Sequence, residues 1–171
     1  SHVSAYKNHQ TGRRLPLKFR FDVAMSGRLG MEIQPKDMSE ADKAFAKRAI
    51  TAYKGIRPVV QFGDLYRLVS PYDHKGISSL MYVTPGKERA VFYAYKISHF
   101  LNMVIPNVRM AGLDPQKKYR ITDLTAVKTD KPCALDGKII SGRMLMNEGV
   151  ALHTLLASEY SSVALELREV K

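Results

Sequence analysis

The sequence contains little cysteine, no tryptophan and no long apolar run. Its one cysteine, Cys133, excludes an internal disulfide and a cysteine-based zinc cage, so the hydrophobic core has to hold the fold together. No apolar run approaches the roughly 20 residues of a membrane-spanning helix, and the first residues lack the charged, apolar and small-residue order of a signal peptide. We therefore expect a water-soluble chain without a membrane partner, and the sequence assigns it no compartment.

Acidic residues are scarce relative to basic ones. The 27 lysines and arginines outnumber 16 aspartates and glutamates, which gives a net charge of +11 and would suit a polyanionic partner. Residues 1–21 carry basic side chains and no acid, but beyond them the two signs are interspersed. The sequence has no RNA-recognition signature, zinc-finger spacing or basic zipper. We expect no nucleic-acid partner.

The length and the composition are those of a globular protein. Of the 171 residues, 45% are apolar and 25% are charged, which is enough for one ordinary domain or two small ones. A complete (β/α)8 barrel takes about 250 residues and does not fit. Ser1 is not an initiator methionine, so we expect this to be part of a longer protein.

The first part of the chain predicts a strand, a loop and a helix. Residues 17–25 mix apolar and polar side chains like a partly buried strand, and the two glycines of Ser26–Gly30 suit a tight loop. Such a unit is typical of a βα repeat, yet one copy cannot form a parallel sheet. We expect the missing repeats to lie on the N-terminal side.

The helix that follows is predicted over residues 39–54. Ser39 is the expected N-cap and Asp42 completes a capping box. Gly55 and Pro58 are expected to end the helix. Apolar residues recur every four positions as a stripe, namely Ala41, Phe45, Ala49 and Tyr53.

Beyond Pro58 the pattern changes to short alternating runs separated by turns, which is typical of an antiparallel β-sandwich. The predicted strands cover residues 64–69, 79–84, 91–97, 104–110, 119–127, 138–146 and 162–170. Tyr93 and Tyr95 share one strand face. They could form a stacking platform for sugar rings, but aromatic residues in strands usually fill a core.

Established catalytic motifs are absent from the sequence. It has no nucleophile elbow, no dinucleotide-binding or phosphate-binding glycine loop and no zinc helix. The polar residues near the start of the chain fit no nucleophile–base–orienter spacing, and the set considered was His2, Ser4, His9 and Asp22. Three further histidines, His74, His99 and His153, lie far apart, and Cys133 is expected to be a spectator thiol. We expect no metal and no cofactor.

Several motifs follow one another in order along the chain, namely segments 2–4, 8–13, 25–32, 56–58, 63–68, 70–72 and 112–115, Tyr119, and Leu145-Met146 before Gly149. Together they resemble the C-terminal part of glycoside hydrolase family 36 α-galactosidases. The resemblance covers essentially the whole chain.

The resemblance implies a catalytic (β/α)8 barrel followed by an antiparallel β-sandwich. Residues 1–58 would be the C-terminal end of the barrel, with 17–25 as its last strand, and residues 59–171 would be the sandwich domain. The expected fold is therefore mainly β, an antiparallel sandwich preceded by a strand–loop–helix remnant of a barrel. An N-terminal domain and most of the barrel would lie outside this chain.

Enzymes of this family are retaining, so the resemblance implies two catalytic aspartates, a nucleophile and an acid/base. The family's motifs around both aspartates are absent here and would lie upstream of Ser1. No catalytic residue is therefore assigned to this chain, and Asp22, Asp37 and Asp64 are not put in their place. His2 and Ser4 match a segment near the open end of the barrel and are candidates for lining the substrate pocket. Gly27 and Gly30 are expected to allow a tight backbone path.

The expected function is that of a C-terminal part of an α-galactosidase acting on galactosides of the melibiose and raffinose type. The chain would support the barrel and be inactive alone. Its partners would be the α-galactoside substrate, the remainder of the barrel and a second copy in a homo-oligomer. The alternatives are a fragment of a raffinose- or stachyose-synthase-type galactosyltransferase, a free-standing carbohydrate-binding sandwich and, third, a basic nucleic-acid binder.

Overall fold

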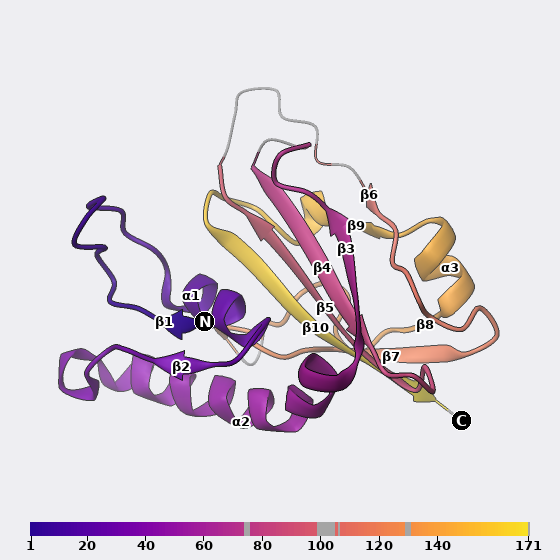
Figure 1. Cartoon of the computed structure of the whole chain (residues 1–171), viewed down its shortest axis with the longest axis horizontal. Helices are drawn as coiled ribbons and strands as arrows, with labels where there is room; N and C mark the ends of the chain where they lie inside the picture. Colours follow the sequence, from indigo (N-terminus) through magenta and orange to yellow (C-terminus); the bar gives the residue numbers. More distant parts are fainter. Residues whose placement is uncertain (74–75, 99–104, 106, 129–130, 171) are drawn as a thin grey trace.

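A six-stranded antiparallel sheet forms the centre of the computed structural model, which describes residues 1–73, 76–98, 105, 107–128 and 131–170 (Figure 1). Its strands lie in the order β3-β4-β5-β10-β7-β8. Their bounds are β3 Asp64–Val69, β4 Ile77–Val83, β5 Arg89–Lys96, β7 Lys118–Asp123, β8 Ile139–Ser141 and β10 Ser161–Val170. Within the described residues no helix is both long and apolar enough to cross a bilayer.

One face of the sheet is covered by the N-terminal part of the chain. This part contains the helices α1 (Leu17–Met25) and α2 (Glu40–Phe62), the short strands β1 (His2–Val3) and β2 (Gly30–Met31), and a 3-10 turn, Pro35–Asp37. In Figure 1 the long helix α2 runs beneath the sheet, with α1 between the two. The tyrosines of β5, Tyr93 and Tyr95, are buried in the core that forms there with Phe21, Phe45 and Ile56.

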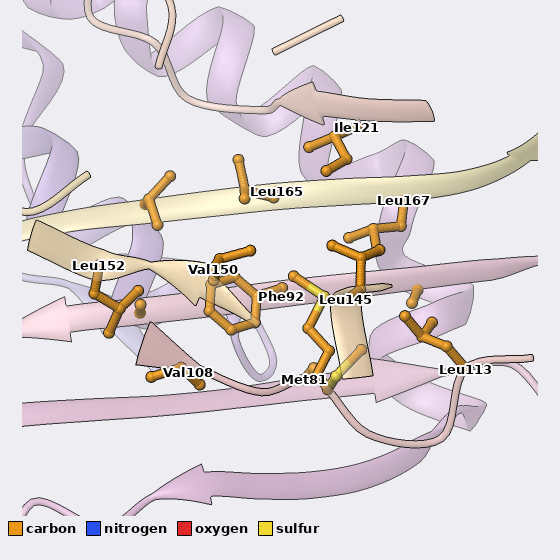
Figure 2. Close-up of a cluster of buried hydrophobic side chains, with 14 of the residues drawn as sticks. Met81, Phe92, Val108, Leu113, Ile121, Leu145, Val150, Leu152, Leu165 and Leu167 are labelled. Carbon is orange, nitrogen blue, oxygen red and sulfur yellow. The ribbon is translucent and has the colours of Figure 1, made fainter. Parts of the chain in front are cut away.

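The other face of the sheet packs against a thin second layer. That layer consists of β6 (Asn107–Val108) paired with β9 (Val150–Ala151), the helix α3 (Gly142–Asn147) and a 3-10 turn, Leu152–Thr154. Figure 2 shows Met81, Phe92, Leu145 and Leu165 converging in this second core. The structure confirms the expected fold class, an antiparallel sandwich behind a remnant with strands and helices.

The predicted strand at residues 17–25 is wrong, because this segment is the helix α1. Phe19 and Phe21 are buried, but so are the neighbouring Arg20 and Asp22. A helix enclosed on nearly all sides has no polar face, so its periodicity does not reveal it. The strands of this part are β1 and β2, which have two residues each and are too short to show a pattern.

The start of the second helix is confirmed and its end is wrong. Ser39 caps it, accepting a 3.1 Å hydrogen bond from the amide of Asp42. Instead of ending at Lys54, α2 continues through Gly55 and Pro58 to Phe62. Ile56, Val59 and Val60 are buried in this extension. Their burial offsets the backbone hydrogen bond that a helical proline removes.

The predicted strands of the sandwich agree with the structure in position, while several of their ends differ. Residues 64–69 are confirmed as predicted. The segment 138–146 divides into β8 and then α3, because the side chain of Ser141 caps a new helix at the amide of Met144. Of the segment 104–110, only Asn107–Val108 is a strand, and residues 104 and 106 lie outside the described residues.

Candidate functional site

The strands β1 and β2 are parallel neighbours, with His2 opposite Gly30 and Val3 opposite Met31. Val3 is fully buried against the helices. Because successive side chains of a strand point to opposite faces, His2 lies on the face turned away from the helices. The carboxyl ends of two parallel strands meet at one edge, where Ser4 follows β1 and Glu32 follows β2.

His2 and Glu32 are paired across this edge, with 2.9 Å between Nδ1 of His2 and Oε1 of Glu32. The two side chains are 60% and 57% exposed, so the pair contributes little to stability. Its effect is orientation. A carboxylate at Nδ1 holds the imidazole ring in one direction and presents Nε2 to the opposite side. Glu32 lies within the motif 25–32, but nothing in the sequence pairs it with His2.

Gly30 lies directly under the His2 ring. A Cβ atom at residue 30 would lie 2.3 Å from Cδ2 of His2, closer than atoms can approach. The expectation of a tight loop is wrong for Gly30, which belongs to β2 and is needed as space for the ring. A Cβ at Gly27 would meet only Oγ of Ser1, at 3.5 Å, which is an ordinary contact.

Ser4 is half-buried, and the backbone around it is tied to α1 by Arg20. The Arg20 guanidinium donates to the carbonyls of Ser4 and Leu15, the second at 3.1 Å from Nε. Burial lowers the pKa of Arg20, while the nearby Asp42 acts in the other direction. Arg20 therefore holds both ends of the loop that leaves β1.

A cavity of about 460 Å³ adjoins this edge, and Glu32 borders both. It is lined by Ala5, Tyr6, Leu17, Arg20, Glu32, Ile33, Gln34, Asp37, Met38 and Asp42. Carboxylate acceptors and one buried guanidinium among apolar walls suit a polar, hydroxylated ligand.

The other polar candidates do not join this site. Within the described residues, no hydrogen bond connects Ser4 Oγ to His2, His9 or Asp22. Asp22 is fully buried instead, and Thr125 and Ser162 each donate to its carboxylate at 2.6 Å. Asp22 therefore has a structural role.

In the described part of the chain, the edge has no metal or thiol site beside it. Among the residues that the structure describes, no three His, Cys, Asp or Glu side chains are grouped to hold a metal ion. His153 is exposed, while His74 and His99 lie outside the described residues. Burial raises the pKa of the half-buried Cys133, which keeps the thiol protonated.

Tyr93 and Tyr95 fill a core, as strand aromatics usually do, and they do not form the alternative sugar platform. Tyr93 is fully buried and Tyr95 is 6% exposed. Their hydroxyls donate at 3.0 Å to the backbone carbonyls of Met25 and Asp22 in α1. Neither ring has a face available to a sugar.

Comparisons with known proteins agree over the whole chain. Residues 77–167 match the family described as Glycosyl hydrolase family 36 C-terminal domain, and residues 1–63 match the family described as Melibiase. The α-galactosidase AgaA of Geobacillus stearothermophilus is 33% identical over 100% of this chain and 21% of its own length. The α-galactosidase C of Emericella nidulans is 35% identical over 95% of this chain and 19% of its own length.

Solved structures give the same result. The crystal structure of AgaA from G. stearothermophilus superimposes on 99% of this chain and 22% of its own, with a TM-score of 0.85 and 33% identity. A variant of AgaA in complex with raffinose has a TM-score of 0.84 and 32% identity, with the same coverage of 99% and 22%. The chain spans about a fifth of the length of the curated relatives that it matches. It belongs to glycoside hydrolase family 36 and corresponds to the C-terminal part of that family's enzymes.

Proposed function

We propose that this chain is the C-terminal part of a retaining α-galactosidase that hydrolyses terminal α-galactosyl residues of melibiose- and raffinose-type galactosides. Residues 1–58 are the end of the catalytic barrel and residues 59–171 are the sandwich domain, with α2 continuing to Phe62 across that boundary. The relatives' names support the activity.

The observation that carries the proposal is the parallel pair β1–β2. The closing repeats of a barrel require two adjacent parallel strands. One face of such a pair is covered by helices, and the other is polar and exposed. Active sites of such barrels lie at the carboxyl ends of the strands, which is where Ser4 and Glu32 are.

In this proposal the two catalytic aspartates belong to the part of the enzyme before Ser1. One attacks the anomeric carbon and the other protonates the leaving oxygen, then activates water. The residues of this chain bind and orient the substrate. The His2 ring, held by Glu32, offers Nε2 to a sugar hydroxyl, and Ser4 offers its hydroxyl. The sandwich supports the barrel, and the isolated chain is inactive.

The test compares this chain with the complete protein in the hydrolysis of a nitrophenyl α-galactoside. We expect hydrolysis only by the complete protein. Hydrolysis by the isolated chain, abolished by a point change within it, would refute the assignment of the chemistry to the upstream part. Formation of raffinose-type products on a sucrose acceptor, in place of hydrolysis, would favour the galactosyltransferase.

A further inference from the structure

Four tyrosine hydroxyls hold the C-terminal end of α1 and the turn that follows it. The last carbonyls of a helix have no partner within the helix, and buried ones need a donor from elsewhere. Here the donors come from the sheet and from α2. Tyr95 bonds the carbonyl of Asp22 and Tyr93 that of Met25, both at 3.0 Å. Tyr82 bonds Ser26 at 2.8 Å, and Tyr53 bonds Gly27 at 2.9 Å.

These four tyrosines act on two different parts of the backbone. Tyr93 and Tyr95 bond residues of the helix itself, whereas Tyr82 and Tyr53 bond the turn that leads from α1 into β2. Tyr53 also accepts the amide hydrogen of Leu29 at 3.3 Å. The path of this turn is therefore set by one hydroxyl from β4 and one from α2.

The turn leads directly to the candidate site. After Leu29, the amide of Gly30 donates to Ser1 at 2.8 Å and the amide of Glu32 donates to Val3 at 3.0 Å. Gly30 then lies under the His2 ring, and Glu32 pairs with its Nδ1. The His2 ring lies against Gly30, so we expect a shift of β2 to move the ring as well.

We propose that Tyr82, a residue of the sandwich, is a positioning residue for the His2–Glu32 pair. Its hydroxyl fixes Ser26 and hence the place where β2 begins. The sandwich thereby determines the geometry of the edge formed by β1 and β2. The structural part of this inference stands on the contacts of this chain alone, and only its catalytic consequence rests on the proposed α-galactosidase function.

Tyr93→Phe is the matched control for Tyr82→Phe. Both changes remove one hydroxyl that donates to a backbone carbonyl, and both residues lie on the same sheet face in the neighbouring strands β4 and β5. Tyr93 is fully buried and Tyr82 only half-buried, so a purely structural role predicts the larger effect for Tyr93.

The experiment is nitrogen NMR of the His2 ring in the 171-residue chain. Glu32→Gln serves as the reference for a His2 ring without its carboxylate partner. We expect Tyr82→Phe to move the Nδ1 resonance of His2 toward its position in Glu32→Gln, while Tyr93→Phe leaves it at the wild-type position. Far-UV circular dichroism establishes that each variant is folded. A His2 signal in Tyr82→Phe that coincides with wild type, or moves no further than in Tyr93→Phe, would overturn the inference.

A second measurement separates this inference from the proposed function. In the complete protein, Tyr82→Phe is expected to lower kcat for a nitrophenyl α-galactoside severalfold with little change in KM. Tyr93→Phe should preserve kcat at temperatures where the protein is folded. If the His2 resonance moves and kcat does not, the positioning by Tyr82 stands and the role of His2 in the proposed chemistry falls.

Discussion

Ser162, in the interior strand β10, donates a 2.6 Å hydrogen bond to the carboxylate of Asp22 in α1. Lys18 pairs with the same carboxylate at 2.7 Å and also donates to Thr125 at 2.7 Å. Buried carboxylates persist only where donors surround them. This cluster of Asp22, Lys18, Thr125 and Ser162 therefore joins the N-terminal helices to the sheet at one defined position.

Replacing the buried carboxylate should destabilise the chain strongly. Asp22→Asn places an amide group, itself a donor, against three donors. Removing one partner of a buried ion pair lowers the free energy of unfolding by about 3–5 kcal/mol. Asp37→Asn is the control, because Asp37 is exposed, and it should stay within about 0.5 kcal/mol of wild type. Urea unfolding followed by circular dichroism measures both. Similar midpoints for the two variants would contradict the structural role of Asp22.

Two glycines should respond differently to alanine. At Gly30 the new methyl group meets the exposed His2 ring, which can move away, so we expect a change in stability of about 0.5 kcal/mol or less. At Gly142 it would lie 2.0 Å from the backbone oxygen of Asp114, which cannot move independently. A loss of about 1–3 kcal/mol is expected there.

Thermal unfolding gives the two stabilities, and the NMR signal of His2 gives the position of the ring. Gly30→Ala should displace the ring and Gly142→Ala should not. Equal melting temperatures for the two variants, or an unmoved ring in Gly30→Ala, would contradict this account.

High pH should unfold the chain through its buried tyrosines. Burial raises the pKa of Tyr82, Tyr93, Tyr95 and Tyr119 above the ordinary value for a phenol. A group whose folded pKa is raised contributes stability that is fully present below its unfolded pKa, about 10, and is lost as the pH rises beyond it. We expect the free energy of unfolding to fall steadily above about pH 10.

Tyrosinate absorbance and circular dichroism, recorded on the same samples, provide the measurement. The buried tyrosines should ionise together with the loss of secondary structure. Ionisation of every tyrosine near pH 10 in a chain that keeps its fold would show that the four side chains are accessible.

The isolated chain should self-associate through β2. Most of the predicted apolar stripe of α2 is covered by its own sheet and α1, with Phe45, Ala49 and Tyr53 buried and only Ala41 exposed. Exposed apolar side chains lie elsewhere, and one of them is Met31 of β2, which is 39% exposed beside a groove along α2. Unpaired strand edges favour association.

Light scattering over a range of concentrations tests this. Met31→Lys should shift the chain toward the monomer, because a charge at a strand edge opposes pairing. Met144→Lys, at an exposed methionine of α3 in the other layer, should have no such effect. A strict monomer at all concentrations would contradict the prediction.

The strands of the sheet and the start of α2 could be predicted from the sequence. Val163, Leu165 and Leu167 alternate with other residues along β10, and all three point into one core. Ser39 caps a helix through its near neighbour Asp42. These signals are local in the chain, so they survive without knowledge of the rest of the structure.

The helix α1, the strands β1 and β2 and the end of α2 could not be predicted in this way. Arg89 of the sheet donates to the carbonyl of Gly55 at 3.0 Å, three residues before the proline that was expected to end the helix. Because Arg89 belongs to a distant segment of the chain, the sequence around residues 55–58 does not indicate this contact. His2 and Ser4 were reached through the family resemblance, and Glu32 through the structure alone.

The sequence by itself determined the β-rich fold, the family and the absence of a catalytic aspartate motif, because each depends on residue types in a fixed order. The tertiary structure decided that residues 17–25 are helical and that Glu32 orients His2. It also decided that Tyr93 and Tyr95 are buried in a core, where their hydroxyls bind α1. A segment buried on all sides has no periodicity to read, and a strand of two residues exists only through the strand beside it. Such features follow from which surfaces meet, and only the folded chain brings those surfaces together.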